Sequence, residues 1–187
     1  MKTIEQLWKK LEKVELIQVR PQEMELMYKH CFEFEKPLFI EIGSAHGASS
    51  IILAEAAKEL KGGLICIDHY PENYYDQDKF GGYARKAFKK NTKEYKNIIT
   101  YLDMPSSEAI NRVKGWECDI LFIDGNHDYE AVKEDCVNFL PILARGGYVG
   151  FHDYNNVAFS GVKKAADMFC AGWEKESVWD LAVFKKP

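Results

Sequence analysis

The sequence predicts an α/β fold in which a mostly parallel sheet carries helices on both faces. Short apolar runs alternate along the chain with segments of helical periodicity, and this order is typical of a parallel sheet with crossover helices. The apolar runs are almost continuously hydrophobic, as expected for strands buried on both sides. The length of 187 residues suits one domain with a sizeable core.

Two helices are expected before the first strand. Ile4, Leu7 and Leu11 recur at helical spacing, and a second helix is expected to follow Pro21. We expect residues 1–36 to form a helical extension that covers an active site or makes a homodimer contact. Residues 37–187 are expected to form the main domain.

The main domain is predicted to contain five successive strands and a strand-like tail. The strands are expected at residues 38–42, 64–67, 98–102, 120–123 and 147–151. The helices between and after them are expected at residues 51–60, 83–91, 106–113, 129–140 and 162–169. The tail, residues 177–184, is expected to form one strand or a hairpin.

Composition argues against several classes of protein. The hydrophobic content of 47% is that of a globular chain, and the net charge of -4 offers no basic excess for nucleic acid. The five cysteines are odd in number and far apart in sequence, which fits neither a disulfide framework nor a paired-cysteine metal site. Reduced thiols predict a cytoplasmic protein. No apolar run is long enough for a membrane span.

The loop after the first predicted strand is a candidate ligand site. Open α/β sheets bind ligands at the carboxyl ends of their strands. Gly43 and Gly47 allow sharp turns and a close approach to a ligand, and Ser49 is placed to cap the following helix. The loop lacks the full glycine pattern of dinucleotide-binding proteins and the lysine of a phosphate loop. A tight turn without a ligand is the alternative.

Two carboxylates beside this loop point to the kind of ligand. Glu41 lies in a buried strand, where a carboxylate needs a cationic or hydrogen-bonding partner. It would repel a diphosphate and suit an ammonium group. Asp68 ends the second strand, where an acidic residue holds ribose hydroxyls in nucleotide-binding folds, although it also fits a turn or a helix cap. Together with Gly43 and Gly47, these carboxylates describe a pocket for a ribose and a positive group, both of which S-adenosylmethionine has. Ala45 and His69 are also counted among the expected cofactor contacts.

A second group of polar residues follows the fourth and fifth strands. Asp124 and Asp153 end these strands, and either His152 or His127 is expected to converge with them. Two close carboxylates need a cation or a shared proton between them. A hard divalent ion such as Mg²⁺ suits oxygen ligands, and a histidine ligand widens the choice toward Mn, Fe or Zn. The alternative is that these residues only form turns.

The sequence resembles the class I S-adenosylmethionine-dependent methyltransferases in three stretches, namely Phe122–Val132, Gly146-Gly147 and His152-Asp153-Tyr154. The resemblance is strongest to small-molecule O-methyltransferases that include macrolide and aminocoumarin sugar enzymes, and more distant to catechol O-methyltransferase. It extends from Pro37 to about Phe184. It implies a Rossmann-like, doubly wound, seven-stranded sheet with a reversed last strand.

The resemblance also implies roles for individual residues. The methionine part of the cofactor would be lined by Glu41, Gly43, Ser44 and Gly47. Asp68 would hold the ribose, and Met104 and Ser106 would flank the adenine. Asp124 and Asp153 would bind a magnesium-like ion, with His152 standing where metal-binding relatives often carry a second aspartate. Asp124 is counted among the cofactor contacts, the metal ligands and the catalytic residues.

These residues predict methyl transfer to an oxygen of a small hydroxylated molecule, assisted by Mg or Mn. His127 or His152 would take the acceptor's proton, since histidine titrates near neutral pH. The alternatives are an NAD-dependent oxidoreductase, which Glu41 and the incomplete glycine pattern disfavour, and a non-catalytic S-adenosylmethionine-binding module. Four tyrosines in one segment are either a substrate lid or part of an exposed loop, namely Tyr70, Tyr74, Tyr75 and Tyr83.

Overall fold

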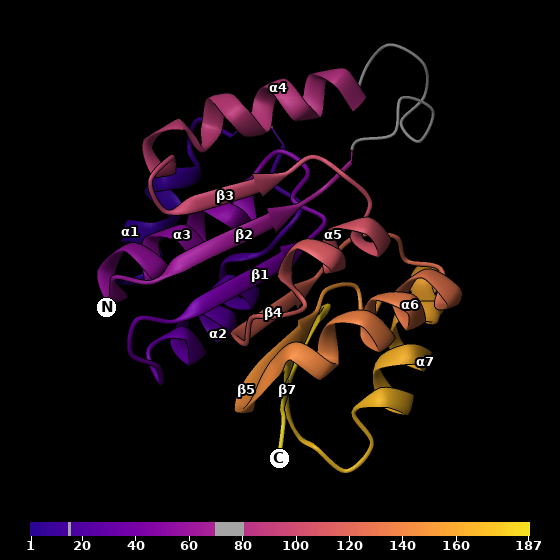
Figure 1. Cartoon of the computed structure of the whole chain (residues 1–187). Helices are drawn as coiled ribbons and strands as arrows, with labels where there is room; N and C mark the ends of the chain where they lie inside the picture. Colours follow the sequence, from indigo (N-terminus) through magenta and orange to yellow (C-terminus); the bar gives the residue numbers. More distant parts are fainter. Residues whose placement is uncertain (15, 70–80) are drawn as a thin grey trace.

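A seven-stranded sheet forms the centre of the computed structural model. The structure describes residues 1–14, 16–69 and 81–187, and in the last of these ranges it describes side chains from residue 84 on. The strand order is β3-β2-β1-β4-β5-β7-β6 (Figure 1). The strands are β1 (Leu38–Ile42), β2 (Gly63–Ile67), β3 (Ile99–Leu102), β4 (Cys118–Ile123), β5 (Leu143–Phe151), β6 (Glu174–Val178) and β7 (Leu181–Lys185). Strand β7 runs antiparallel to both neighbours, and the other described pairs are parallel. The predicted doubly wound sheet with a reversed last strand is confirmed.

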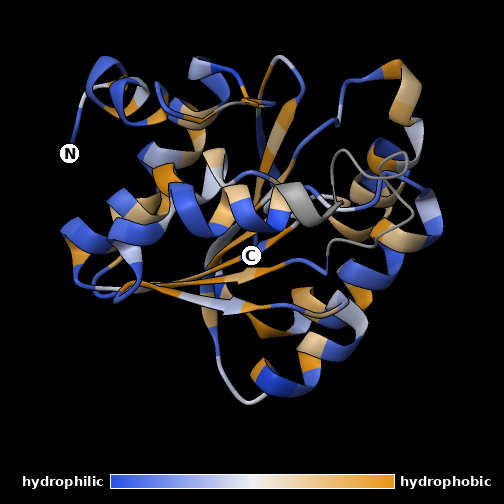
Figure 2. Cartoon of the chain, turned by 90° about the horizontal axis from the view of Figure 1, so that it is seen from above, coloured by the Kyte–Doolittle hydropathy of each residue, from blue (hydrophilic) through white to orange (hydrophobic). Residues whose placement is uncertain are grey.

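Helices cover both faces of this sheet. They are α1 (Ile4–Leu11), α2 (Pro21–Cys31), α3 (Ala48–Leu60), α4 (Gly81–Asn91), α5 (Ser106–Val113), α6 (Tyr129–Phe139) and α7 (Ser160–Phe169). Buried residues of α1 to α4 share one apolar cluster with one face of the sheet, and those of α5 to α7 share a second cluster with the other face. Figure 2 shows the strands as largely hydrophobic between helices that are hydrophilic on their outer sides.

The sequence periodicities located these elements closely. The tail forms a hairpin of β6 and β7, one of the two outcomes expected for it. The described part of the chain also contains short 3-10 turns that were not predicted, η1 (Lys93–Tyr95), η2 (Leu140–Ile142) and η3 (Val157–Phe159). Such single turns leave no apolar periodicity in the sequence.

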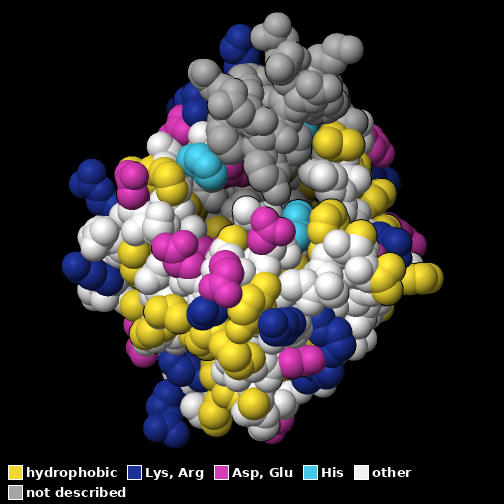
Figure 3. All heavy atoms as spheres, turned by 90° about the vertical axis from the view of Figure 1, so that its right-hand side faces the viewer, with side chains coloured by type: hydrophobic (Ala, Val, Ile, Leu, Met, Phe, Trp, Pro, Cys, Tyr) yellow, Lys and Arg dark blue, Asp and Glu magenta, His cyan; other side chains and the backbone are white. Residues whose placement is uncertain are grey.

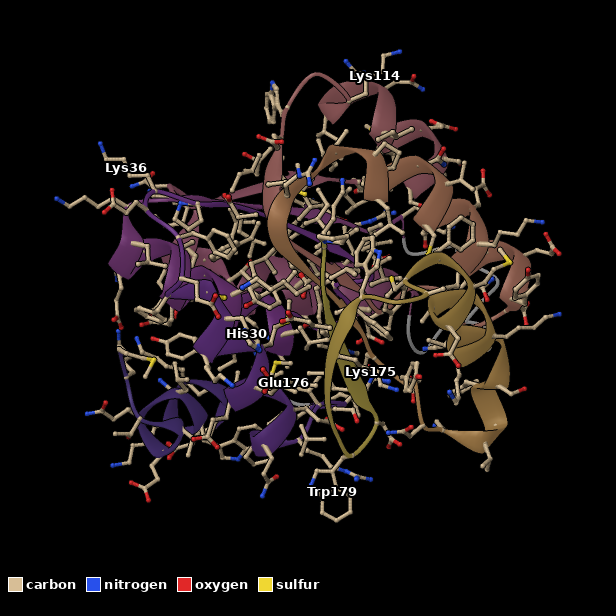
Figure 4. All side chains as sticks on the ribbon, turned by 90° about the horizontal axis from the view of Figure 1, so that it is seen from below. His30, Lys36, Lys114, Lys175, Glu176 and Trp179 are labelled. Carbon is tan, nitrogen blue, oxygen red and sulfur yellow. The ribbon has the colours of Figure 1, made fainter. Side chains whose placement is uncertain are left out.

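The N-terminal helices belong to the main hydrophobic core. Leu7, Leu11 and Met24 are fully or almost fully buried in the cluster that contains Phe39 of β1. Helix α2 also contacts the C-terminal hairpin, where the His30 Nε2 atom lies 3.3 Å from Glu176 Oε1 (Figure 4). The apolar sides of α1 and α2, which suggested a dimer contact, are therefore covered within the chain itself.

The cysteines and the helices also bear on the kind of protein this is. All five cysteines are buried as free thiols, as small hydrophobic residues would be. Among the described helices, none combines the length and apolar character that a bilayer crossing requires.

Candidate cofactor and metal site

A cavity of about 450 Å³ opens at the carboxyl ends of β1, β2 and β4. In Figure 1 the arrows of β2 and β3 point to the right, and Figure 3 views that side of the molecule. Acidic and histidine side chains gather near the centre of this face. The sheet therefore presents its polar strand ends to one cavity, as open α/β sheets do.

The cavity brings together most of the cofactor residues predicted from the sequence. Those that line it are Gly43, Ala45, Asp68, His69, Met104, Ser106 and Asp124. Four others do not line it, namely Glu41, Ser44, Gly47 and Ser49. The expected tyrosine lid falls on Tyr70, Tyr74, Tyr75 and the Tyr83 side chain, which lie outside the described residues.

The glycine loop is shaped by its two glycines and held by Asp68. Gly43 has φ +85° and Gly47 has φ +86°, both in the left-handed region that favours glycine. The backbone N–H groups of Ser44 and Ala45 both donate to Asp68 Oδ2, at 2.9 and 3.0 Å. Asp68 thus ties the end of β2 to the loop that follows β1, and it lines the cavity from this position.

Glu41 has a different position from the one that the sequence argument gave it. Its side chain is fully buried beneath the loop, and it accepts hydrogen bonds from the hydroxyls of Ser44, at 2.8 Å, and Ser50. Side chains alternate along a strand, so Glu41 shares with Phe39 the face covered by α3, while Ile42 faces the cavity. Burial raises the pKa of Glu41, and the serine hydroxyls oppose the rise. The carboxyl therefore lies beneath the loop, where it accepts hydrogen bonds from two serines, and it does not line the cavity.

Several cavity residues were missed in the sequence, and Asp135 is the most informative. The others are Ile42, Ile67, Pro105, Ser107, Gly125, Asn126, Ala131 and Glu134. Asp135 lies in the middle of α6, and no role was predicted for it. Its spacing of four residues from Ala131 and three from Val132 places it on the buried face. That periodicity was the available signal.

Asp135 is a buried carboxyl at the side of the cavity between α5 and α6. It is 4% exposed, and its Oδ1 atom accepts a hydrogen bond from Ser106 Oγ at 2.6 Å. Burial raises its pKa from the ordinary 3.8 to about 6, Ser106 opposes the rise, and the neighbouring Glu134 adds to it. The ionised form of Asp135 is therefore disfavoured in the folded protein.

Asp135→Asn is expected to stabilise the protein at alkaline pH. Because the folded-state pKa is the higher one, the cost of ionising Asp135 is small below its ordinary pKa and complete above about 6. Asparagine keeps an acceptor for Ser106 and avoids this cost. The stabilisation should be about 2 kcal/mol larger at about pH 8 than at about pH 4.5. Urea unfolding of both proteins at these pH values measures it, with the exposed Glu130→Gln as a control. A difference that does not change with pH would contradict the argument.

The ends of β4 and β5 bring four predicted side chains together. His152 Nδ1 lies 3.2 Å from both Asp124 Oδ1 and Asp153 Oδ2. His127 Nε2 lies 3.0 Å from Asp153 Oδ2 and 3.8 Å from Asp124 Oδ1. The Phe159 ring stacks on His127, with ring centroids 4.2 Å apart. Both histidines, rather than one, therefore share the carboxylates.

These contacts govern the charges of the cluster. Burial lowers the pKa of His152, but Asp124, Asp153 and Glu23 raise it to about 12. Burial also opposes protonation of His127, yet the two aspartates raise its pKa to about 9. Burial raises the pKa of Asp153, and His127, His152 and Asn156 outweigh it, so the pKa lies well below its usual range. Without a bound cation, the two histidines supply the positive charge that the carboxylates require.

Glu23 of α2 is a member of this cluster that the sequence did not reveal. It is 1% exposed, and its Oε2 atom lies 3.4 Å from His152 Nε2. The backbone N–H groups of Arg20 and Asp180 donate to its two oxygens at 2.7 and 3.0 Å. An N-terminal helix thus supports the site at the end of β5.

Glu23→Gln is expected to destabilise the protein by about 2–4 kcal/mol near pH 7. The change removes the charge that faces His152 and gives one backbone N–H a poor partner, and breaking a buried pair from one side is costly. Urea unfolding measures the loss. Glu25→Gln, on the exposed side of the same helix, is the control. Equal stability of the two variants would show that the buried pair contributes nothing.

The same cluster has a donor set that fits a divalent cation. Asp124, His152 and Asp153 each offer one ligand atom, and these atoms lie within 4.8 Å of one another. Asp153 has φ 57°, in the left-handed region, and its Oδ1 atom accepts a hydrogen bond from Asn156 at 2.8 Å. Two carboxylate oxygens and one imidazole nitrogen suit Mn²⁺ well and Mg²⁺ less well.

Comparisons with known proteins agree with this architecture. Residues 40–154 match the family described as methyltransferase domain. The uncharacterized protein R132 of Acanthamoeba polyphaga mimivirus is 28% identical over 140 residues, which are 69% of this chain and 57% of that protein. The uncharacterized protein y4gI of Sinorhizobium fredii (strain NBRC 101917 / NGR234) is 25% identical over 118 residues, 61% of this chain and 13% of that protein. The chain thus spans only part of the length of both curated relatives.

Solved structures share the fold at low sequence identity. A putative caffeoyl-CoA O-methyltransferase from Staphylococcus aureus has a TM-score of 0.73 and 18% identity, covering 100% of this chain and 93% of that one. The SAH-bound Podospora anserina methyltransferase PaMTH1 has a TM-score of 0.67 and 16% identity, covering 98% and 85%. The family match spans well over half of the sequence and includes the glycine loop, Asp68 and Asp124. The chain therefore belongs to the methyltransferase domain family, and it has the fold of the S-adenosylmethionine-dependent methyltransferases.

Proposed function

We propose that this protein transfers a methyl group from S-adenosylmethionine to an oxygen of a small hydroxylated molecule. The observation that carries the proposal is the cavity itself. Its lining brings Asp68 and residues of the glycine loop together with the apolar side chains of Ile67 and Met104 and with Asp124. We take Asp68 as the ribose contact, with the adenine against Ile67 and Met104 and the sulfonium toward Asp124. A chain of this family with such a cavity is suited to hold the methyl donor in line with an acceptor.

The protein's contribution to the reaction is alignment and removal of a proton. The sulfonium already activates the methyl group, so catalysis depends on holding donor and acceptor in the reactive geometry. His127 is the better candidate for the general base, because its side chain is 25% exposed whereas that of His152 is 7% exposed. A cation held by the two aspartates would take over their charge and lower the pKa of His127 from about 9, so that the ring could accept a proton. His152 is held among Asp124, Asp153 and Glu23 and is suited to a fixed role.

A divalent cation, Mg or Mn, is part of the proposal. Asp124, His152 and Asp153 would hold it. When bound, it would lower the pKa of an acceptor hydroxyl and fix its direction. The stacked pair of His127 and Phe159 lies beside these ligands and would border the acceptor.

Two further expectations complete the proposal. The five buried thiols suit a reducing compartment, so we place the protein in the cytoplasm. The net charge of -4 gives no basis for a nucleic-acid partner, and we propose none and no membrane partner. The homodimer is not included, because the apolar faces that suggested it are buried against the sheet.

Binding and turnover test the proposal separately. Isothermal titration calorimetry should show binding of S-adenosylhomocysteine and none of NAD, which serves as the control ligand. A panel of phenols, sugars and carboxylic acids is then assayed for transfer of a labelled methyl group, with Mn²⁺, with Mg²⁺ and with a chelator. Binding of NAD in place of S-adenosylhomocysteine would reject the cofactor. Full transfer in the presence of chelator would reject the metal alone.

A further inference from the structure

Glu23 is a buried carboxylate that α2 places behind the imidazole ring of His152. Backbone N–H groups hold both of its oxygens, since Arg20 donates to Oε2 at 2.7 Å and Asp180 donates to Oε1 at 3.0 Å. The same Oε2 atom lies 3.4 Å from His152 Nε2. Because main-chain donors from two separate segments fix the carboxylate, it presents the ring with an acceptor in a fixed position.

The two nitrogens of His152 face carboxylates on different sides of the ring. Nδ1 lies 3.2 Å from Asp124 Oδ1 and 3.2 Å from Asp153 Oδ2, whereas Nε2 faces Glu23. Turning the ring over about its bond to Cβ would point carbon atoms at these carboxylates in place of the nitrogens. The contacts on both sides therefore determine which way the ring faces.

We propose that Glu23 positions His152 as a cation ligand by holding the ring proton on Nε2, which leaves the Nδ1 lone pair directed toward the two aspartates. This inference rests on the proposed function, because it takes a divalent cation as the occupant of that cluster. A ring nitrogen that binds a cation carries no proton, so the proton that remains must lie on the other nitrogen. An ionised carboxylate only accepts hydrogen bonds, so it favours the ring form with the proton on Nε2.

The choice of nitrogen decides whether His152 assists a cation or replaces it. With its single proton on Nδ1, the ring would donate to Asp124 and Asp153 and occupy the place of the cation. With the proton on Nε2, the ring donates to Glu23 and leaves an imidazole nitrogen beside two carboxylate oxygens. Glu23 is thus a positioning residue, which acts on the cation through His152 alone.

Nitrogen NMR of isotope-labelled histidine reads the protonated nitrogen directly. The protein is loaded with Zn²⁺, a diamagnetic ion that imidazole binds well, and the signals of His152 are identified by their loss in His152→Asn. Wild-type protein should show a proton on Nε2 and a metal-bound Nδ1. Glu23→Gln should lose this single form, because an amide can either accept from Nε2 or donate to it. A wild-type ring that carries its proton on Nδ1, or binds the ion through Nε2, would overturn the inference.

A double-mutant cycle on Mn²⁺ affinity separates positioning from a plain loss of charge. Electron paramagnetic resonance of the free ion should show that Glu23→Gln weakens binding by roughly 10- to 100-fold. In a His152→Asn background, the same substitution should have an effect at least about fivefold smaller, because no ring remains to be positioned. Glu25→Gln removes the same charge from the exposed side of α2 and should keep the wild-type affinity. Circular dichroism of each variant confirms that folded protein is compared.

The alternative is that Glu23 serves the fold alone, since it also forms a capping box with Arg20 at the start of α2. In that case Glu23→Gln would leave the protonated nitrogen unchanged and would weaken Mn²⁺ binding by the same factor in both backgrounds. That result would overturn the inference while the cation site stands. Wild-type protein that binds neither Mn²⁺ nor Zn²⁺ would reject the inference together with the cation. Binding of S-adenosylhomocysteine, measured separately, would still support the methyl donor.

Discussion

Gly43→Ala is expected to cost more than about 4 kcal/mol of folding free energy and to abolish cofactor binding. A Cβ atom on Gly43 would lie 2.1 Å from the carbonyl oxygen of Asp124 and 2.6 Å from the nitrogen of Gly125. Both neighbours are backbone atoms of the segment that follows β4, so they cannot rotate away as a side chain would. The φ of +85° adds strain for any residue with a Cβ. Effects of this size arise from such specific clashes.

Alanine variants of two other glycines separate the effect of the steric clash from the effect of the positive φ. Gly146 also has a positive φ, of +76°, but a Cβ there would meet nothing within 4 Å, so Gly146→Ala should cost only about 1 kcal/mol of strain. Gly47→Ala should be intermediate, because its Cβ would meet the Thr92 and Phe88 side chains at 3.0 and 3.2 Å, and these can shift. Urea unfolding and calorimetry with S-adenosylhomocysteine measure all three. Equal stability of Gly43→Ala and Gly146→Ala would show that the close approach does not exist in solution.

The close approach at Gly43 also explains how the site is assembled. The Asp124 N–H donates to the carbonyl of Ile42 at 2.8 Å, so the chain after β4 continues the pairing with β1 as far as the glycine. With a side chain at position 43, these two segments would separate. Asp124 would then move away from the loop that Asp68 holds. The absence of a side chain at Gly43 therefore allows the glycine loop and Asp124 to lie close together.

The fold could be predicted from the sequence because the periodicity of apolar residues locates the helices and strands. The site residues could be predicted only where they directly follow a strand. Asp68, Asp124 and Asp153 were found because each follows an apolar run. Glu41 was assigned to the cofactor because it lies one residue before a strand end, and the alternation of side chains places it on the opposite face. Strand ends can be located from one sequence, but the face that a residue occupies decides what it contacts.

Residues contributed from distant elements could not be found in this way. Glu23 and His152 are 129 positions apart in the sequence, and no local pattern relates them. Their contact depends on α2 packing beside the C-terminal hairpin, which is a property of the tertiary structure. Asp135 had a helical-periodicity signal, but its residue type suggested a solvent-facing position. Both are charged residues in buried positions, where the usual inference from residue type to exposure fails.

Asp68→Ala is expected to weaken binding of S-adenosylhomocysteine by roughly 100-fold or more. The carboxylate makes two kinds of contact, to the ribose under the proposed function and to the N–H groups of Ser44 and Ala45 in the structure. Hydrogen bonds to a charged group are worth about 1.5–3 kcal/mol each, and two lost contacts reach this range of affinity. Truncation also leaves the glycine loop without its anchor, so a moderate loss of stability should accompany it.

Asp68→Asn separates these two contributions, because both loop N–H groups donate to the same oxygen, Oδ2. An asparagine that places its carbonyl oxygen there keeps the loop anchored and changes only the atom that meets the ribose. We expect near wild-type stability and binding of S-adenosylhomocysteine that is about tenfold weaker. Asp103→Ala is the matched control, since Asp103 follows the neighbouring strand and pairs with Arg85 at 3.1 Å outside the cavity. If calorimetry gave Asp68→Ala and Asp103→Ala the same affinity, Asp68 would have no contact with the ribose, and the orientation of the cofactor in the cavity would have to be reversed.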